Sequence, residues 1–357
     1  MKKKKILITS PSLDTNKNVS GISTLTSLLV KNNSHVNYYH CRVGRDDNQK
    51  RDIFWVLQQF KLIFSFILKL IKIRFDIIHI NIPLSELAII VNFILIIISK
   101  VLFKNVIVHL RGGKLSLNDN INFFQFCVIY FSLRFSNSII VLGTKEKNYI
   151  SKKFSVNSKK INVLANAVVI PKFKKKTNFD EMNIVFLGRI DKNKGIDYIL
   201  TALKDLKSKF KFKFYLAGTG PYKKTCVTKF SEHLGERFVY LGIQNHEEKS
   251  KIFSKSHIFL LPSFFEGLPN ALLESMSFGV VPIVTSVGSI GEVVINHKNG
   301  IIVPKYNYTQ ISKNIISLFK NNNLLNKLSL NAYNTIKKSF SLDTYISELN
   351  NIYDSID

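Results

Sequence analysis

The stretch IFLLPSFFEGLPNALLE, residues 258–274, decides the expected fold of this chain. Its first four residues are a short apolar run that stops at Pro262, which is typical of a buried strand. A loop with Glu266 and Gly267 follows, and the sequence after Pro269 reads as a helix. A buried strand, a short loop and a helix in this order indicate one unit of a parallel α/β sheet.

The same order of strand, loop and helix recurs along most of the chain. Short continuous apolar runs that alternate with helical stretches indicate parallel sheets covered by helices on both faces. We therefore expect an α/β chain with two tandem doubly wound Rossmann-like domains. The expected strands are residues 4–10, 35–39, 77–80, 106–110, 139–142 and 161–164 in the first half, and 183–187, 212–217, 239–241, 258–261 and 281–284 in the second.

Residues 171–180 interrupt this pattern because they are polar and basic and begin with a proline, so we expect a linker there. The predicted domains are accordingly residues 1–170 and residues 181–340. The last segment, residues 341–357, has apolar residues at helical spacing. We expect it to form a helix that caps one of the two domains, with a crossing back to the N-terminal domain as one option.

The composition is that of a large globular protein. Of 357 residues, 46% are hydrophobic and 21% are charged, which excludes a disordered chain or a small disulfide scaffold. The three cysteines, Cys41, Cys127 and Cys226, lie far apart and match neither a zinc site nor a disulfide framework, so we expect a reducing compartment. Lys2–Lys5 precede only three apolar residues, too few for a secretory signal.

The net charge of +27 is concentrated in the first half of the chain. Residues 1–178 hold 29 Lys and Arg against 8 Asp and Glu, whereas residues 179–357 hold 22 against 16. An excess of this size favours anionic lipid, nucleic acid or phosphorylated ligands as partners of the N-terminal domain. The alternative is compositional drift, since lysine is abundant throughout the chain.

Two apolar stretches of the N-terminal domain raise the question of a membrane. Residues 87–99 carry no charge, but they are shorter than the ~20 residues of a spanning helix, so we expect a buried helix. Residues 53–73 are more apolar than one sheet face requires, and their polar residues share an arc of about 80° on a helix. The segment is either an interfacial helix on anionic lipid or a sheet-covering helix with lysines facing water. The polar residues are Gln58, Lys61, Ser65, Lys69 and Lys72.

The second half carries the residues that point to chemistry. Residues 188–195, GRIDKNKG, place Arg189 and Lys194 in a glycine turn before a helix, an arrangement that suits a phosphate. Glu266 and Glu274 lie eight residues apart, and their carboxylates can accept hydrogen bonds from hydroxyls. A ligand that is part phosphate and part sugar fits both groups. The plain alternative is a solvated basic loop beside two capping carboxylates.

Several motifs in order resemble those of the retaining glycosyltransferases of family 4, which have the GT-B fold. This resemblance implies two domains facing an interdomain cleft, and a role in bacterial surface polysaccharide synthesis. The motifs are GRIDKNKG (188–195), LAGTGPYKK (216–224), VYLG (239–242), the E-x7-E block FFEGLPNALLESMSFGVVPIVTSVGSIGEVV (264–294) and NGIIVP (299–304).

The resemblance also implies roles for single residues. Arg189 and Lys194 would hold the donor diphosphate, Glu274 the ribose hydroxyls, and Glu266 the transferred sugar. A UDP- or GDP-linked sugar would be the donor, with no metal and no further cofactor. The other residues implied in donor binding are Gly267, Leu268, Pro269, Asn270, Gly21, Gly218 and Gly242.

The N-terminal domain matches the family more loosely. Gly21 is what remains of the glycine-rich loop that usually follows the first strand. Many relatives have a histidine directly before a glycine at the end of a middle strand, and here Arg111 precedes Gly112. Either His109 serves near the reacting sugar, or Arg111 has replaced the histidine. Arginine cannot act as a base, but it can bind anionic groups.

The function implied is that of a retaining, metal-independent hexosyltransferase. It would move a sugar from a nucleotide diphosphate sugar to a hydroxyl of a glycan or of a polyprenyl-diphosphate-linked acceptor, for a capsule or a lipopolysaccharide. The enzyme would be cytoplasmic and peripheral at the inner face of the membrane, on an anionic surface, with no specific nucleic acid. The alternatives are a nucleotide-sugar epimerase or hydrolase of GT-B fold and a basic membrane- or nucleic-acid-binding module.

Overall fold

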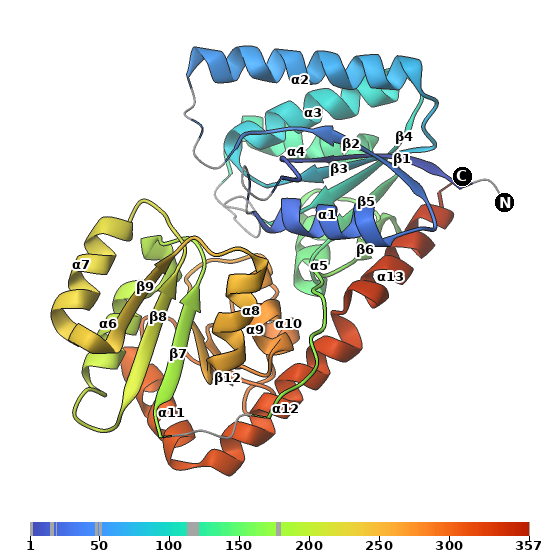
Figure 1. The fold of residues 1–357 in the computed structure, drawn as a ribbon. Coiled ribbons are helices and arrows are strands. Elements are labelled where there is room, and N and C mark those ends of the chain that lie inside the picture. Colours follow the sequence, from blue (N-terminus) through green and yellow to red (C-terminus); the bar gives the residue numbers. More distant parts are fainter. Residues whose placement is uncertain are drawn as a thin grey trace. The chain divides into compact units, whose positions relative to one another are not determined.

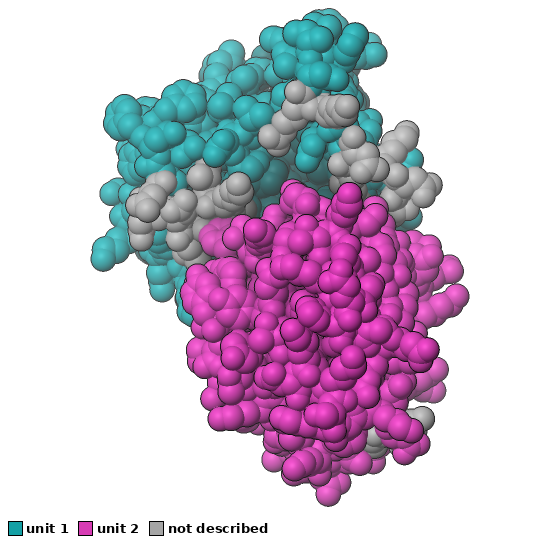
Figure 2. Space-filling view, turned by 90° about the vertical axis from the view of Figure 1, so that its left-hand side faces the viewer, with its two compact units in different colours: residues 1–166, 342–357 teal, residues 167–341 magenta. Residues whose placement is uncertain are grey.

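The computed structural model divides the chain into two compact units, coloured separately in Figure 2. Unit 1 comprises Met1–Asn166 and Leu342–Asp357, and unit 2 comprises Ala167–Ser341. The residues that the structure describes are 3–14, 18, 20–46, 49, 52–112, 121–175 and 180–356.

Unit 1 contains a parallel sheet in the order β2-β1-β3-β4-β5-β6 (Figure 1). The central strands β1, β3, β4 and β5 are mostly apolar and buried, as expected for strands covered on both faces, whereas the edge strand β2 is NYYHCR and mostly half-buried. The strands are β1 (Lys5–Ser10), β2 (Asn37–Arg42), β3 (Ile77–Ile82), β4 (Asn105–Leu110), β5 (Ser138–Val141) and β6 (Ile161–Val163), and the helices are α1 (Gly21–Asn32), α2 (Ile53–Lys72), α3 (Glu86–Val101), α4 (Phe123–Phe135), α5 (Thr144–Lys153) and α13 (Leu342–Asp354).

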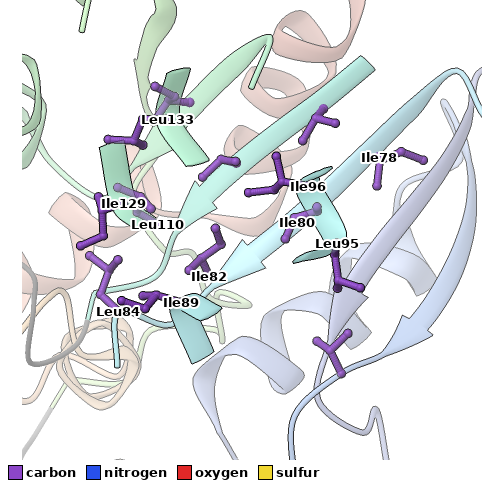
Figure 3. Close-up of a cluster of buried hydrophobic side chains, with 14 of the residues drawn as sticks. Ile78, Ile80, Ile82, Leu84, Ile89, Leu95, Ile96, Leu110, Ile129 and Leu133 are labelled. Carbon is purple, nitrogen blue, oxygen red and sulfur yellow. The ribbon is translucent and has the colours of Figure 1, made fainter. Parts of the chain in front are cut away.

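Helices cover both faces of this sheet. On one face, buried residues of α2, α3, α4 and α5 pack against alternate residues of the strands in one apolar cluster, part of which is drawn in Figure 3. Ile78, Ile80 and Ile82 of β3 point into this cluster, as the two-residue period of a strand requires. On the other face lie α1 and α13. Lys4 ties α13 to the start of β1, because its Nζ donates to the carbonyl oxygens of Tyr353 at 2.8 Å and Ile356 at 3.0 Å.

Unit 2 contains a second parallel sheet, in the order β12-β11-β10-β7-β8-β9. Its strands are β7 (Met182–Leu187), β8 (Phe212–Ala217), β9 (Phe238–Gly242), β10 (Ile258–Leu261), β11 (Val281–Val284) and β12 (Ile301–Ile302), and its helices are α6 (Ile196–Lys204), α7 (Lys223–Leu234), α8 (His246–Lys255), α9 (Asn270–Ser277), α10 (Ile290–Val293), α11 (Tyr308–Lys320) and α12 (Asn322–Ser339).

The expected fold class is confirmed, with two parallel sheets of six strands surrounded by helices. The observed strands match the expected ones within a few residues, and β12 adds a strand of two residues that sequence reasoning treated only as a motif. The apolar stretch 87–99 forms α3 and buries one of its sides, as expected. Of the expected linker 171–180, residues 176–179 lie outside the described part of the chain.

Candidate functional site

The candidate site of unit 2 lies where the order of its strands reverses. The first strand, β7, has β8 on one side and β10 on the other. Loops that follow two such strands diverge, and in open α/β sheets ligands bind in the crevice between them, at the carboxyl ends of the strands. Here the diverging loops are residues 188–195 and 262–269, the two loops singled out from the sequence.

Lys194 and Glu266 come together between these loops. Lys194 Nζ donates to Glu266 Oε1 at 2.6 Å, and the Ser263 hydroxyl donates to the same oxygen at 2.8 Å. The side chain of Glu266 is 8% exposed and that of Lys194 is 21% exposed. The backbone joins the loops as well, because the Phe264 amide donates to the Asn193 carbonyl at 2.8 Å. A charge-assisted bond this short in a half-buried place holds both side chains in fixed positions.

Glu274 belongs to a second ion pair, which the sequence did not predict. It lies in the second turn of α9 and accepts from Lys249 Nζ of α8 at 2.6 Å. The two side chains are 15% and 18% exposed. Lys249 precedes Glu274 by 25 residues and is one of several lysines in α8, so no spacing rule singles it out.

Glycines let the loops of the site approach each other. Gly195 has φ +69°, and a Cβ atom there would lie 2.1 Å from the Pro262 carbonyl oxygen. Gly218 has φ +125°, and a Cβ atom there would lie 1.9 Å from the Gly188 carbonyl oxygen. Any side chain at these places would push the loops apart, which explains why the sequence has glycine there.

The remaining residues predicted for the donor in unit 2 lie around the same edge. Arg189 has a side chain that is 64% exposed, with its Nε 3.9 Å from the Asp191 carboxylate. The Gly242 carbonyl accepts from the Gly218 amide at 2.6 Å, so β9 ends beside the glycine turn of β8. Residues 267–269 lead into α9, which begins at Asn270, and Leu268 among them is buried.

A recess of about 310 Å³ opens one strand away, at the ends of β11 and β12. Hydrogen bonds link one of its lining residues to the carboxylate site. The Thr285 hydroxyl donates to the Ser263 carbonyl, and the Ser263 hydroxyl donates to Glu266. The residues that line it are Thr285, Ser286, Ile302, Val303, Pro304 and Lys305.

In unit 1, His109 is fully buried rather than at a surface. Its ring stacks on that of His79 in β3, and Nδ1 lies 3.2 Å from His79 Nε2. Its Nε2 has no hydrogen-bond partner among the described residues. Burial lowers the pKa of His79 to about 3 and the pKa of His109 well below its ordinary value, and the Arg111 charge lowers both further. Both rings are therefore neutral.

A chain of hydrogen bonds decides which nitrogen of each ring carries the proton. Asn33 Nδ2 donates to the Tyr38 hydroxyl at 3.0 Å, which leaves that hydroxyl to donate to the Tyr353 hydroxyl at 3.4 Å. Tyr353 then donates to His79 Nδ1 at 2.7 Å, and His79 Nε2–H donates to His109 Nδ1. With Tyr353 as the donor to His79, the proton of His109 sits on Nε2, which has no partner among the described residues.

Arg111 is half-buried and held by three partners. Its Nε donates to Asn81 Oδ1 at 2.7 Å, one Nη to Asn166 Oδ1 at 3.1 Å, and the other Nη to the Tyr345 hydroxyl at 3.2 Å. Gly21 is the first residue of α1, after the N-cap Ser20. His109, Arg111 and Gly21 thus belong to unit 1, whereas the carboxylates and their lysines belong to unit 2.

The geometry of unit 2 agrees with what a family comparison finds. Residues 169–335 match the family described as glycosyl transferases group 1. This group 1 segment includes β7 to β12 and all four members of the two ion pairs. The motifs noted in the sequence therefore lie within a segment that is similar to group 1 glycosyltransferases.

Curated relatives of the chain include archaeal and bacterial proteins. The uncharacterized glycosyltransferase MJ1607 of Methanocaldococcus jannaschii is 25% identical over 240 residues, 63% of this chain and 61% of that protein. The capsular polysaccharide biosynthesis glycosyltransferase CapM of Staphylococcus aureus is 25% identical over 64% of this chain and 58% of that protein. An α-1,4-N-acetyl-D-galactosaminyltransferase of Campylobacter jejuni, named for a glycan on PP-undecaprenol, is 27% identical over 56% of this chain and 55% of that protein. The chain thus spans less than two thirds of the length of these relatives.

A solved structure matches over nearly the whole chain. It is HepE of Anabaena in complex with UDP and glucose. The match has a TM-score of 0.77 at 14% identity and covers 99% of this chain and 100% of the HepE chain. At that identity the match shows the fold alone, which is the GT-B fold of glycosyltransferases.

Proposed function

We propose that the protein is a retaining glycosyltransferase of the E-x7-E type that takes its sugar from a nucleotide diphosphate sugar. The observation that carries this proposal is the half-buried pair of Lys194 and Glu266 between the diverging loops of β7 and β10. It places a cation and a hydroxyl-accepting carboxylate in the crevice where open α/β sheets bind ligands.

The second pair makes the site compatible with a diphosphate. Two half-buried carboxylates alone would repel an anionic donor. Lys249 beside Glu274 and Lys194 beside Glu266 remove that repulsion, since each carboxylate has an ammonium group at 2.6 Å. Both carboxylates keep lone pairs that can accept from hydroxyls. In the proposed complex Glu274 accepts from the ribose and Glu266 from the transferred sugar.

Positive charge at the leaving group drives the proposed reaction. Arg189 has an exposed side chain, and Lys194 lies on the same loop at the start of α6. Both stabilise the charge that develops on the diphosphate as its bond to the sugar breaks. The acceptor hydroxyl then attacks from the face that the diphosphate left: its oxygen forms the new bond to the sugar and its proton passes to the departing diphosphate oxygen, so the configuration is retained. We propose that these cations act without a metal ion, so that transfer continues in the presence of a chelator.

The acceptor we propose is a glycan or a polyprenyl-diphosphate-linked glycan at the inner face of the cell membrane, in surface polysaccharide synthesis. Two relatives support this, since one is named for capsular polysaccharide biosynthesis and the other for a glycan on PP-undecaprenol. The positive charge of residues 1–178 also favours an anionic, membrane-linked acceptor.

Binding of nucleotide sugars tests the proposal. UDP- and GDP-sugars are titrated into the protein by calorimetry, and the one that binds is used in transfer assays that separate transfer products from epimers and free sugar. Glu274→Gln should weaken binding at least tenfold, because a hydrogen bond to a charged group is worth about 1.5–3 kcal/mol. The matched control is Glu232→Gln on the exposed surface of α7, which should bind like the unaltered protein. Equal binding by both variants would contradict the assignment.

A further inference from the structure

The outer side of three neighbouring helices in unit 1 is unusually apolar. Of the 23 large hydrophobic residues exposed in the described chain, 15 lie on α2, α3 and α4. We call their outward side chains the apolar face. Its members are Ile53, Phe54, Val56, Leu57, Phe60, Phe64, Leu68 and Ile71 of α2, Leu87, Ile94 and Val101 of α3, and Phe123, Phe124, Phe131 and Phe135 of α4.

Helix α2 supplies most of this face. Phe54, Phe60 and Phe64 are 76%, 67% and 61% exposed, whereas Phe66 and Leu70 on the opposite side are buried in the core cluster. At about 100° per residue, six of the eight exposed apolar side chains of α2 fall within an arc of about 80°. The helix therefore has two apolar sides, one for the sheet and one without a partner in the described part of unit 1.

The other two helices continue the same surface. Helix α3 packs between α2 and α4, and all three contribute to the same core cluster on one face of the sheet (Figure 1). On α3 the exposed apolar residues recur every seven positions, at Leu87, Ile94 and Val101, opposite its buried side. So many exposed apolar side chains on three helices that pack side by side exceed the scattered ones of an ordinary monomer surface, and this favours an interaction site.

The charges on these helices identify the partner. Together α2, α3 and α4 contain five Lys and Arg and one acidic residue, Glu86. Lys61 and Lys72 are exposed and border the apolar arc of α2, and Arg134 is exposed on α4. A second copy of the chain would bring like charges together across a two-fold contact, whereas acidic headgroups above a hydrocarbon layer complement both the lysines and the apolar side chains.

Helix α2 is long and apolar enough to cross a bilayer by length and composition. Its packing favours a helix that lies on the surface instead. Phe66 is fully buried in the core cluster, and Lys69 Nζ donates to the His40 carbonyl at 2.7 Å. A spanning helix would have to break both contacts and expose the core that they close.

We propose that the apolar face docks unit 1 on an anionic bilayer, with α2 lying in the plane of the interface. The exposed phenylalanines enter the acyl boundary while Lys61 and Lys72 remain among the headgroups. The proposal deepens the function proposed above, since it gives the transferase a means of reaching a lipid-linked acceptor, but the docking itself does not depend on which sugar is transferred.

Sedimentation with vesicles tests this proposal on the full chain. The vesicles are phosphatidylcholine with or without phosphatidylglycerol, and Phe60→Ser combined with Phe64→Ser is compared with the unaltered protein. The partition coefficient of the variant should fall about tenfold or more, because two phenylalanine side chains no longer enter the bilayer. The matched control, Ile243→Ser with Ile295→Ser, changes two exposed apolar residues of unit 2 and should bind as before.

Charge reversal and oligomeric state complete the test. Lys61→Glu with Lys72→Glu should reduce binding at least tenfold on vesicles with phosphatidylglycerol and little on phosphatidylcholine alone. Unchanged vesicle binding by the phenylalanine variant, or a dimer in lipid-free solution that this variant abolishes, would overturn the proposal. Nucleotide-sugar binding should be unaltered in every variant, so loss of docking and failure of the proposed activity give different results.

Discussion

At the scale of single residues, the buried pair of histidines in unit 1 has consequences for stability. His79 and His109 have no exposed surface, and their pKa values are lowered because burial disfavours the charged ring. In the unfolded chain both rings titrate near pH 6.5. As the pH falls below 6.5, the unfolded state takes up two protons that the folded state excludes, and stability is lost between about pH 6.5 and pH 3.

We therefore predict that acidification destabilises the protein through these rings. Between pH 7.5 and pH 5.5 they should remove about 2–3 kcal/mol from the free energy of unfolding of unit 1. Urea unfolding at the two pH values measures the loss. In the variant with His79→Gln and His109→Gln, the change in the free energy of unfolding between the two pH values should be smaller by about 2–3 kcal/mol. The control His246→Gln, at an exposed position of α8, should show the same change as the unaltered protein. An equal pH dependence in all three proteins would contradict the prediction.

The hydrogen-bond chain predicts a second effect. Tyr353→Phe leaves buried His79 Nδ1 without a partner, and the Tyr38 hydroxyl loses the acceptor of its proton while it keeps the bond from Asn33. An unsatisfied buried polar group costs about 1–3 kcal/mol, so the free energy of unfolding should fall by that much or more. Tyr306→Phe, at an exposed tyrosine of unit 2, is the control and should unfold at the original urea concentration. A variant Y353F as stable as the control would show that the chain does not hold the tautomers.

Residue by residue, the sequence predicted that Lys194 and Glu266 belong to one site but predicted neither ion pair. Lys194 and Glu266 belong to motifs whose loops follow adjacent strands, so topology alone brings them together. Lys249 lies in α8, and its meeting with Glu274 depends on the packing of two helices, which no spacing encodes. His109 was expected near a sugar because of its place in the chain, but its exposure depends on whether α13 covers that end of the sheet.

At the scale of elements, glycines decide how the loops of unit 2 pack. Gly195 and Gly235 both have positive φ, but only Gly195 has a neighbour within 4 Å of where a Cβ atom would lie. A substitution at Gly235 therefore introduces backbone strain alone, whereas one at Gly195 introduces both backbone strain and a steric clash. The strain of an L-residue in such a conformation costs about 1–3 kcal/mol at either position.

Replacing these glycines by alanine tests the packing of the site. Gly235→Ala should lower the free energy of unfolding by about 1–3 kcal/mol and leave nucleotide-sugar affinity unchanged. Gly195→Ala should cost more, and it should weaken nucleotide-sugar binding at least tenfold because the clash with the Pro262 carbonyl separates the two loops. Calorimetry on both variants measures the affinities. Equal affinities would mean that the loop contact does not shape the site.

The elements themselves were largely predictable because their signals are local. Buried parallel strands read as continuous apolar runs, and every strand but β12 was placed from such a run. β12 has two residues, too few for a pattern. For α2, periodicity showed that the polar residues share an arc, but not which arc faces the sheet. In the structure α2 covers the sheet with Lys61 and Lys72 exposed, while Lys69 is half-buried and contacts the His40 carbonyl. An apolar side of the helix is exposed as well, so the interfacial alternative also stays open.

At the scale of the whole molecule, the last helix belongs to the first unit. Tyr345, Leu349 and Tyr353 of α13 are buried in unit 1, although the 175 residues of unit 2 separate them from the rest of it in the chain. The free energy of unit 1 therefore depends on a segment from the far end of the sequence. The sequence left open which domain this helix caps, because its amphipathic pattern fits the face of either sheet.

Deleting residues 342–357 should consequently damage unit 1 and spare unit 2. The deletion removes six buried hydrophobic side chains, Leu342, Tyr345, Leu349, Ile352, Tyr353 and Ile356, each worth about 1.5–3 kcal/mol. Hydrogen exchange should show lost protection in β1 and β3 and unchanged protection in β7 and β10. Leu349→Ala, which keeps the helix and costs about 2–5 kcal/mol, should give a weaker form of the same pattern. A uniform loss over both units would contradict two separate folding units.

The place of α13 also bears on how the protein emerges from the ribosome. The six strands of the first sheet are synthesised before unit 2, but the helix that closes one of its faces follows unit 2 in the chain. Unit 2 is continuous in the chain and can fold as soon as it is out. The first sheet is thus completed only after the whole of unit 2 has been synthesised, and one of its faces stays without its helix α13 until then.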